Sequence, residues 1–240
     1  MDIIKDLINN NYYKGDNRQI KYIVIHYTTS RSSTKGSAKS SRDWFNNPNA
    51  QASAHYCVDD DSIIQCVEDK DSAWHCGTKG TYYCECRNAN SIGIEMASNH
   101  PDKTSKEIDA QDPRWYFTDK TIINTVELVK YLMHKYGINL DHVIMHYDVT
   151  HKWCPAPFLN DKSKWDDFKS MLVESDRYNT LDSVPEWGKE AVAFMISQGY
   201  LKGDSVGALN LSYDMLRLLV IIYRITQDRG VLNVLQNRVI

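Results

Sequence analysis

The chain has 240 residues, of which 42% are hydrophobic and 25% charged, with a formal net charge of −3 and a pI near 6.2. This composition is typical of a folded globular protein and excludes a disordered chain. The mildly acidic balance, without a long basic run, gives no electrostatic reason to bind nucleic acid, so we expect no such partner. The length predicts one core domain and a small second module.

The sequence predicts neither a signal peptide nor a membrane span. Residues 1–19 are interrupted by polar and charged residues and lack the apolar core of about 7–15 residues that export requires. The longest apolar run, LRLLVIIY at 216–223, is far shorter than the ~20 residues that cross a bilayer. We therefore expect no membrane partner.

Six cysteines occur, at positions 57, 66, 76, 84, 86 and 154. In a secreted protein they could form three disulfides, but without an export signal free thiols are expected. Cys57 and Cys66 would face each other across a hairpin, and Cys84 and Cys86 are too close for a Cys-x-x-Cys clamp. A second metal site is therefore not predicted.

Short β-branched runs dominate the first hundred residues. KYIVIH at 21–26 is predicted to be a buried strand that ends at His26. SAHYCVDDDSIIQCV at 53–67 has two alternating segments around an Asp/Ser turn, which predicts a β-hairpin. SIGIEMAS at 91–98 is predicted to be a further strand, and helix and loop both remain open between the first strand and the hairpin.

A helix and one more strand follow. Residues 119–136 place apolar side chains at helical spacing, and Gly137 follows as a C-cap. HVIMH at 142–146 is predicted to be a short strand that ends at His146, with a loop into 161–174 after it. This order predicts an α/β fold with a mixed central β-sheet flanked by helices.

The composition changes at the polar stretch DRYNTLDSVPEWG, residues 176–188. We place a boundary there, which gives a larger domain at 1–175 and a small helical module at 176–240. In the module, residues 187–203 are predicted to form a helix closed by Gly199 or Gly203. A second helix is predicted from a Ser at position 212 to a Gly at position 230.

Two histidines at predicted strand ends and one cysteine suggest a metal site. Cys154 follows His146 in a proline-bounded loop, close enough to fold back beside it, and His26 ends another strand. A catalytic zinc takes three ligands from His, Cys, Asp or Glu and leaves one position for water. The three residues can form such a site, although a lone strand-end histidine is more often a surface or hydrogen-bonded residue and a free cysteine a small buried hydrophobe.

Five sequence blocks occur in order: VIHYT (24–28), SAHYCVDDDSIIQCVED (53–69), SAWHCG (72–77), NANSIGIEMA (88–97) and HYDVTHKWCPAP (146–157). Together, over residues 20–170, they resemble the zinc-dependent N-acetylmuramoyl-L-alanine amidases, which include phage endolysins, bacterial autolysins and animal peptidoglycan recognition proteins. The resemblance implies the mixed sheet, one Zn²⁺ per chain held by His26, His146 and Cys154, and bacterial peptidoglycan as the substrate.

The resemblance also implies two catalytic residues. Glu95 matches the acidic residue that lies over the attacking water, and Lys152 matches the lysine that faces the scissile carbonyl. Some relatives use a tyrosine in place of the glutamate, but this sequence has Ala54 at that position, and Tyr56 is expected to point to the opposite face. Without the family blocks, both residues would be interpreted as solvated surface charges.

The remaining histidines are assigned more simply. His75 resembles a position that lines the substrate groove, and Trp74 is expected to order the same loop, so both are predicted to bind substrate. His55 belongs either to the core or to the groove. His151 is not aligned with a ligand position. Three histidines are interpreted as surface residues, namely His100, His134 and His142.

These inferences predict a lytic hydrolase that cuts the bond between N-acetylmuramic acid and L-alanine. The alternative is a non-catalytic peptidoglycan-binding protein, since recognition-type relatives lose the zinc, typically by replacing the cysteine that is present here as Cys154. The missing signal peptide favours an endolysin that waits in the host cytoplasm before lysis, with an autolysin exported by another route as the second option.

The C-terminal module resembles one repeat of the S-layer homology type. PEWGKEAVAFMISQGYLKG at 185–203, followed by a helix with Arg217 and Arg224, carries the resemblance. It implies binding to a secondary cell-wall polymer, and the alternative is a helical extension that only packs on the larger domain. Because a single repeat buries little surface, an apolar stripe is expected to pair between chains as a homo-oligomer: Leu216, Leu219, Val220 and Tyr223.

Overall fold

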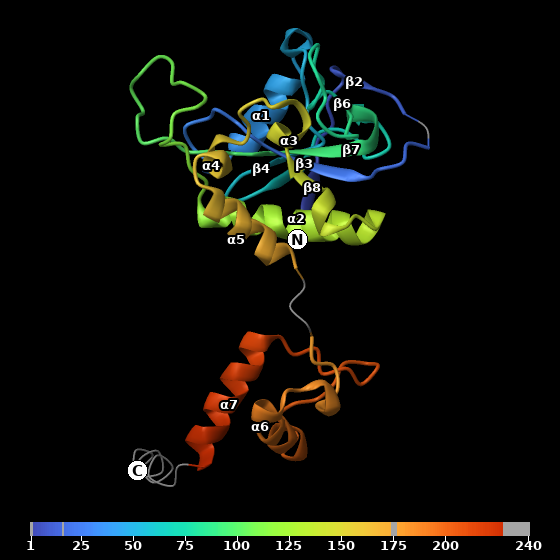
Figure 1. The fold of residues 1–240 in the computed structure, drawn as a ribbon, viewed down its shortest axis with the longest axis vertical. Helices are drawn as coiled ribbons and strands as arrows, with labels where there is room; N and C mark the ends of the chain where they lie inside the picture. Colours follow the sequence, from blue (N-terminus) through green and yellow to red (C-terminus); the bar gives the residue numbers. More distant parts are fainter. Residues whose placement is uncertain (1, 16, 174–176, 228–240) are drawn as a thin grey trace. The chain divides into compact units, whose positions relative to one another are not determined.

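The structure is a computed structural model that describes residues 2–15, 17–173 and 177–227 (Figure 1). The chain divides into two compact units, Met1–Val173 and Glu174–Ile240. The first unit contains a central β-sheet and the second a pair of helices. Within the described ranges, no helix combines the length and the apolar character that crossing a membrane requires.

A six-stranded sheet with the order β1-β5-β4-β7-β3-β8 forms the centre of the first unit. Its neighbouring strands are parallel except for β4 and β5, which form the predicted antiparallel hairpin. The strands are β1 (Ile3–Lys5), β3 (Tyr22–Tyr27), β4 (Tyr56–Val58), β5 (Ile63–Gln65), β7 (Ser91–Met96) and β8 (Val143–Met145). A separate antiparallel pair is formed by β2 (Tyr12–Tyr13) and β6 (Ser72–Ala73). The predicted mixed sheet is confirmed.

Five α-helices belong to the described part of this unit: α1 (Ser37–Phe45), α2 (Asp119–Tyr136), α3 (His146–Thr150), α4 (Ala156–Leu159) and α5 (Lys162–Leu172). The helix predicted at 119–136 is confirmed as α2. Thr118 caps its start by accepting a hydrogen bond from the Thr121 N–H, and Gly137, at φ 63°, ends it. That left-handed backbone conformation costs glycine little, which is why glycine is common there.

Alternation along the strands gives the sheet two different faces. On one face Ile25 of β3 and Ile94 of β7 are fully buried in a cluster that includes Leu128 of α2 and Phe168 of α5. In Figure 1, α2 and α5 lie below the sheet and α1 lies above it. Burying each such side chain stabilises the fold by about 1.5–3 kcal/mol. The other face carries the polar residues of the candidate site.

One predicted boundary is wrong. The last strand, β8, stops at Met145, and His146 is the first residue of α3 instead of the end of a strand. The turn forms because the Met145 N–H donates a hydrogen bond to the carboxylate of Asp148 at 2.8 Å. The loop predicted after His146 contains two short helices, α3 and α4, and the segment 161–174 that it leads into forms α5, with Asp161 as its N-cap.

Helix α1 occupies the region that the sequence left open. The N–H groups of Gly36 and Ala38, at its start, donate hydrogen bonds to the carboxylate of Asp59, at 3.1 and 3.0 Å. Asp59 is fully buried just after β4, so the cap comes from a distant part of the chain. A search for local capping residues misses such a helix start.

The second unit contains α6 (Glu186–Ser197) and α7 (Tyr213–Gln227). Both predicted helices are present, and Gly199, with φ 72°, lies just beyond the end of α6. The predicted closing glycine of α7, Gly230, lies outside the described residues. The two helices pack closely because Gly188 leaves room for Leu216, whose Cδ1 would lie 2.7 Å from a Cβ at that position.

Much of the apolar stripe predicted to pair between chains is used inside the second unit. Leu216 and Val220 are buried, and the Tyr223 ring packs at a tilt against Phe194 while its hydroxyl donates to Glu190. A different set of apolar side chains on α7 is exposed, namely Leu218, Ile221, Ile222 and Ile225. If α7 pairs between chains, this second set is the face that is free to do so.

Candidate active site

The site begins with two residues on neighbouring parallel strands. His26 of β3 and Glu95 of β7 are direct partners in the strand register, and both stand near the carboxyl ends of their strands. They belong to the face opposite the cluster that contains Ile25 and Ile94, since successive side chains alternate. Ligands of open α/β sheets commonly bind at this edge, beyond the carboxyl ends of the strands.

His146 and Cys154 join His26 at this edge. The potential ligand atoms of the three residues all lie within 4.8 Å of one another, and the residues are only 4%, 3% and 2% exposed. The His26 Nδ1 lies 3.8 Å from the Cys154 Sγ, and the two imidazole rings meet edge to face with centroids 4.7 Å apart. The loop folds back as predicted, because the Tyr147 N–H donates to the Cys154 carbonyl at 2.9 Å.

Burial controls the protonation of these three groups. It lowers the pKa of His26 well below its ordinary range and, with the nearby Lys152 and His75, that of His146 to about 3. Burial also raises the pKa of the Cys154 thiol to about 12. The imidazoles are therefore neutral, with lone pairs available as metal ligands.

The three residues fit a metal ion. The His146 Nδ1 is buried and has no hydrogen-bond partner, and a buried polar atom in that state is costly unless another group satisfies it. Two imidazoles and one thiolate are a donor set that suits zinc, and three protein ligands leave a fourth position open. Within the described residues, His26, His146 and Cys154 are the one such group of three.

Two members of the group, His26 and Cys154, line a pocket of about 860 Å³. Glu95 and Lys152 line the same pocket, and Lys152 is exposed to it. Burial raises the pKa of the Glu95 carboxyl to about 8, and the charge of Lys152 opposes that rise. A carboxyl with such a pKa exchanges a proton readily near neutral pH.

Trp74 and His75 also line the pocket, but they differ in their surroundings. Trp74 is half-buried, and its ring packs against Tyr13 with centroids 5.1 Å apart. His75 is buried, and its Nδ1 lies 3.1 Å from the His26 Nε2. Tyr56 is outside the pocket lining, because its hydroxyl donates to Asp69 within the core. His55 is fully buried and accepts from the Gly93 N–H.

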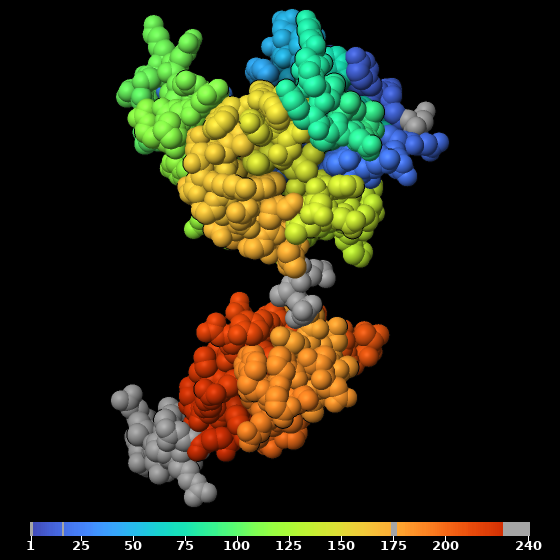
Figure 2. Space-filling view, viewed as in Figure 1, coloured from blue at the N-terminus to red at the C-terminus, as the bar shows by residue number. Residues whose placement is uncertain are grey.

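A loop that the sequence did not single out forms one wall of the pocket. Lys103 and Ala110 line the pocket, and Figure 2 shows their segment, in green, as a projection at the edge of the first unit. The loop is closed at its base by Asn99 and Tyr116, which pair as an isolated antiparallel bridge.

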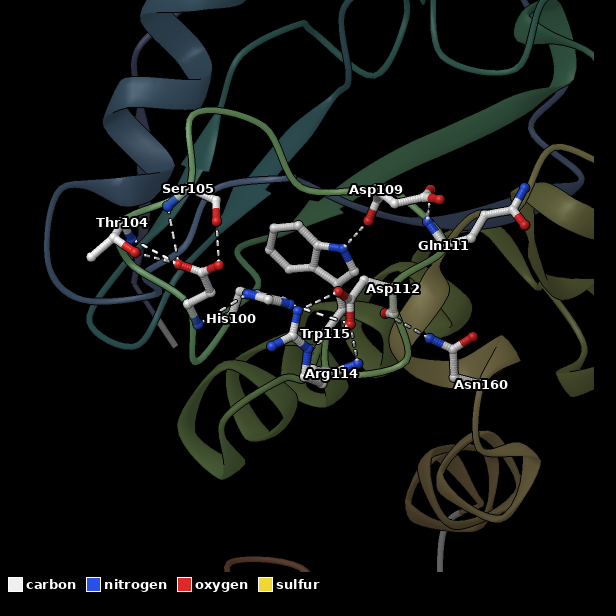
Figure 3. Close-up of polar contacts among 10 residues, drawn as sticks. His100, Thr104, Ser105, Asp109, Gln111, Asp112, Arg114, Trp115 and Asn160 are labelled. Atoms are coloured by element: carbon white, nitrogen blue, oxygen red, sulfur yellow. Dashed lines mark hydrogen bonds and ion pairs between the residues drawn. The ribbon is translucent and has the colours of Figure 1, made fainter.

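Polar contacts and one buried ring pair hold this loop in place (Figure 3). His100 was predicted to be a surface residue, which is wrong, because it is fully buried against Trp115 with ring centroids 4.7 Å apart. The indole N–H of Trp115 donates to the Asp109 carbonyl, and Asn160 donates to the Asp112 carbonyl. No local hydrophobic pattern marks His100 as buried, since its partner follows 15 positions later, across the loop.

A His-His-Cys group beside a pocket that a carboxylate and a lysine line is the arrangement of a metal-dependent hydrolase. Comparison with known families agrees with this class. The profile of the family described as N-acetylmuramoyl-L-alanine amidase (Amidase_2) matches residues 16–157. The chain belongs to this family.

Curated relatives include two amidases from bacilli. The chain is 29% identical over 182 residues to the N-acetylmuramoyl-L-alanine amidase CwlL of Bacillus licheniformis, covering 71% of this chain and 46% of that protein. It is 31% identical over 166 residues to the amidase BlyA of Bacillus subtilis, covering 64% of this chain and 41% of that protein. The chain thus spans less than half the length of both relatives.

Solved structures show the same fold. The catalytic domain of XlyA, an amidase of Bacillus subtilis, superposes with a TM-score of 0.56 at 28% identity, covering 72% of this chain and 100% of that domain. A mutant endolysin from Bacillus subtilis gives a TM-score of 0.56 at 29% identity, covering 72% of this chain and 99% of that chain. The shared region accounts for the sheet and its helices.

Proposed function

We propose that the chain is a zinc-dependent peptidoglycan hydrolase that cleaves the amide bond between N-acetylmuramic acid and the L-alanine of the stem peptide. The observation that carries the proposal is that His26 and Cys154, which form a group with His146, line the same pocket as Glu95 and Lys152. Membership of the amidase family supports the choice of this bond over other amides.

His26, His146 and Cys154 would hold one Zn²⁺ per chain. Zinc, when bound, supplies a Lewis acid for the amide carbonyl and makes water acidic enough to attack it near neutral pH. The protein contributes the positions of its ligands, which come from a strand, a helix start and a fixed loop. Because these elements are formed by the fold, metal binding should not require the chain to refold.

Glu95 is proposed as the general base. Its carboxylate would take the proton from the attacking water and return it to the nitrogen of the leaving L-alanine, and its raised pKa suits both steps. The Lys152 ammonium would donate a hydrogen bond to the oxygen that becomes negative when the carbonyl is attacked. One such donor is typically worth about 2.7–4 kcal/mol in the transition state.

Trp74 is proposed to bind the substrate as part of the wall of the pocket that Lys103 also lines. Its half-buried indole offers an apolar surface to a sugar or a peptide side chain. His75 was predicted to share this role, and its ring lines the same pocket. A Trp74→Ala variant should raise KM for soluble muropeptides more than it lowers kcat.

The decisive experiment is the identification of the bond that is cut. Purified protein is incubated with bacterial sacculi, and new L-alanine amino termini are compared with new reducing sugar ends. We expect only amino termini, loss of activity with a chelator, and recovery with Zn²⁺. New reducing ends, or full activity in protein with no zinc by elemental analysis, would contradict the proposal.

The alternative of a non-catalytic peptidoglycan-binding protein makes a different prediction for the same assay. Such a protein would bind sacculi and release neither product. Cys154 argues against it, because the thiol completes the three-ligand group that binders typically lose.

We further propose that the chain acts as an endolysin, present in the host cytoplasm before lysis. The similarity to an endolysin of Bacillus subtilis supports this placement over that of an exported autolysin. Expression in a bacterial host should leave the cells intact until the membrane is permeabilised. Lysis without permeabilisation would favour an exported enzyme.

The second unit is proposed to hold the enzyme on the wall by binding a secondary cell-wall polymer. Its two helices pack into their own core around Val192 and Leu216, so they form a compact unit of their own. Deleting residues 174–240 should leave cleavage of soluble muropeptides unchanged but lower activity on intact walls, because tethering can raise apparent affinity by ~10²–10⁴-fold. Equal wall binding by both forms in a sacculus pull-down would show that the unit only packs.

Self-association through α7 is a separate proposal, supported by its exposed apolar face at Leu218, Ile221 and Ile225. Light scattering of the full chain should then give a mass above that of one chain. An Ile221→Lys variant should return it to a monomer, whereas Arg217→Lys, at another exposed position of α7, should leave the mass unchanged.

A further inference from the structure

A series of hydrogen bonds begins at the His26 Nε2, whereas the His26 Nδ1 is the ring nitrogen near Cys154. The His26 Nε2 lies 3.1 Å from the His75 Nδ1, and the His75 Nε2 lies 3.0 Å from the Ser91 Oγ. The Ser91 Oγ in turn lies 2.7 Å from the backbone carbonyl of Arg87. The two histidines and the serine are buried, so water does not compete for these contacts.

Which group donates in each hydrogen bond of this series follows from its last member, the Arg87 carbonyl. A backbone carbonyl only accepts, so the Ser91 hydroxyl must donate to Arg87, and its oxygen is left to accept from the His75 Nε2–H. A neutral imidazole carries one N–H, and the His75 Nδ1 is therefore an acceptor. It accepts from the Nε2–H of His26.

The consequence for His26 is a fixed tautomer. With its single proton on Nε2, its Nδ1 is bare and faces Cys154, at 3.8 Å from the Sγ. The opposite tautomer would place a proton where the metal must bind. Hydrogen bonds to the second ring nitrogen of a ligand histidine are known to fix the tautomer and the ring orientation in this way.

We infer that His75 and Ser91 are positioning residues that hold His26 in the tautomer able to bind the metal. The inference rests on the proposed function, since it concerns the same metal group. In this inference His75 acts by positioning His26, whereas the sequence predicted that His75 contacts the substrate directly.

The backbone around His75 is built to keep its ring in this place. The His75 N–H and the Cys76 N–H both donate to the side-chain oxygen of Asn88, at 3.2 and 2.8 Å. The ring crosses β7 at Gly93, where a Cβ would lie 2.4 Å from the His75 Cγ. Any side chain at that position would push the ring away from His26.

The test measures zinc affinity of the full chain by competition with a chelator at a fixed pH. His75→Leu removes the acceptor and should weaken zinc binding by about 10–100-fold. His75→Asn places an amide oxygen where Nδ1 stood, so it should recover most of that loss. Ser91→Ala leaves the His75 proton free to move to Nδ1 and should weaken binding by a smaller factor.

Ser98→Ala is the matched control. Ser91 and Ser98 are both 0% exposed hydroxyls that donate to backbone carbonyls, but Ser98 bonds Thr28 and Ser30 and has no contact with a histidine. The zinc affinity of the Ser98→Ala variant should equal that of the wild type. Equal affinity in the His75 and Ser91 variants as well would overturn the inference, while a wild-type chain that binds no zinc would instead refute the proposed function.

A second measurement stays informative if a variant fails to fold. Long-range ¹H–¹⁵N NMR of the wild-type chain reports which imidazole nitrogen carries the proton. We expect a protonated Nε2 and a bare Nδ1 for His26, and the same tautomer for His75. A proton on the His26 Nδ1 of the zinc-free chain would contradict the inference directly.

Discussion

The two faces of strands β3 and β7 have different roles, although the same backbone carries both. On one face Ile25 and Ile94 pack into the core under α2 and α5, where only size and shape matter. On the other face, one residue further along each strand, His26 and Glu95 face the pocket. Because the side-chain period of a strand is two, stability and chemistry are separated by a single position in the sequence. Substitutions on the apolar face should therefore lower stability, whereas substitutions on the pocket face should lower activity.

The largest expected effect lies on the pocket face. Glu95→Gln removes the proposed base while keeping the size of the side chain, and should lower kcat by about 10²–10⁴-fold with the zinc content unchanged. The assay is release of L-alanine amino termini from soluble muropeptides. Glu127→Gln, on the exposed side of α2, is the control and should match the wild type. A Glu95→Gln enzyme within a few-fold of wild type would place the base elsewhere.

The next effect concerns the lysine of the same pocket. Lys152→Met keeps the length of the side chain but removes its charge and its donors, and should lower kcat by about 10²–10³-fold. Lys130→Met, on the solvent side of α2, controls for the loss of a surface charge. If Lys152 only attracts the substrate, KM will rise at unchanged kcat, and its assignment to the transition state will be wrong.

The apolar face should respond in stability alone. Ile94→Ala leaves a cavity under α2 and should lower the free energy of unfolding by about 2–5 kcal/mol, measured by urea denaturation. The folded fraction should keep its kcat, because the neighbouring Glu95 is held by the strand register. A large loss of kcat in fully folded Ile94→Ala protein would show that the two faces are coupled.

The smallest effect depends on pH. Burial opposes ionisation of Asp69, but hydrogen bonds from Tyr136 and Tyr56 and the ion pair with Lys135 outweigh it, so its pKa is lowered. A lowered pKa means that the ionised form stabilises the fold above the unfolded pKa of about 3.9. This contribution is lost as the pH falls through the folded pKa.

Asp69→Asn should therefore be less stable than wild type at pH 7, with the gap closing in acid below about pH 4. Urea midpoints between pH 3 and pH 7 measure the gap. A gap that does not change with pH would mean that Asp69 acts by packing alone, without its charge.

The sequence predicts best where a signal is local. The helix over 119–136 and its glycine cap follow from spacing and from one residue, and both are confirmed. The hairpin likewise follows from two alternating segments, and β3 and β7 follow from short apolar runs. The family blocks brought His26, His146 and Cys154 together before any geometry was known.

Features that depend on distant partners could not be predicted. The start of α1 is set by Asp59, which lies 23 positions after Gly36. His100 is buried by Trp115, which only the closed loop brings to it. The contact between His75 and His26 spans 49 positions, and its sole trace in the sequence is Gly93, a glycine within a strand.

The register that pairs His26 with Glu95 has a consequence for how such a chain can change. Backbone hydrogen bonds of a parallel ladder fix these two residues, while Lys103 and Ala110 reach the pocket from a loop anchored by its own contacts. This loop can therefore be exchanged, altering which substrates are accepted, without a change in the spacing between His26 and Glu95. Substrate selectivity can therefore evolve through this loop alone, while the strands stay unchanged.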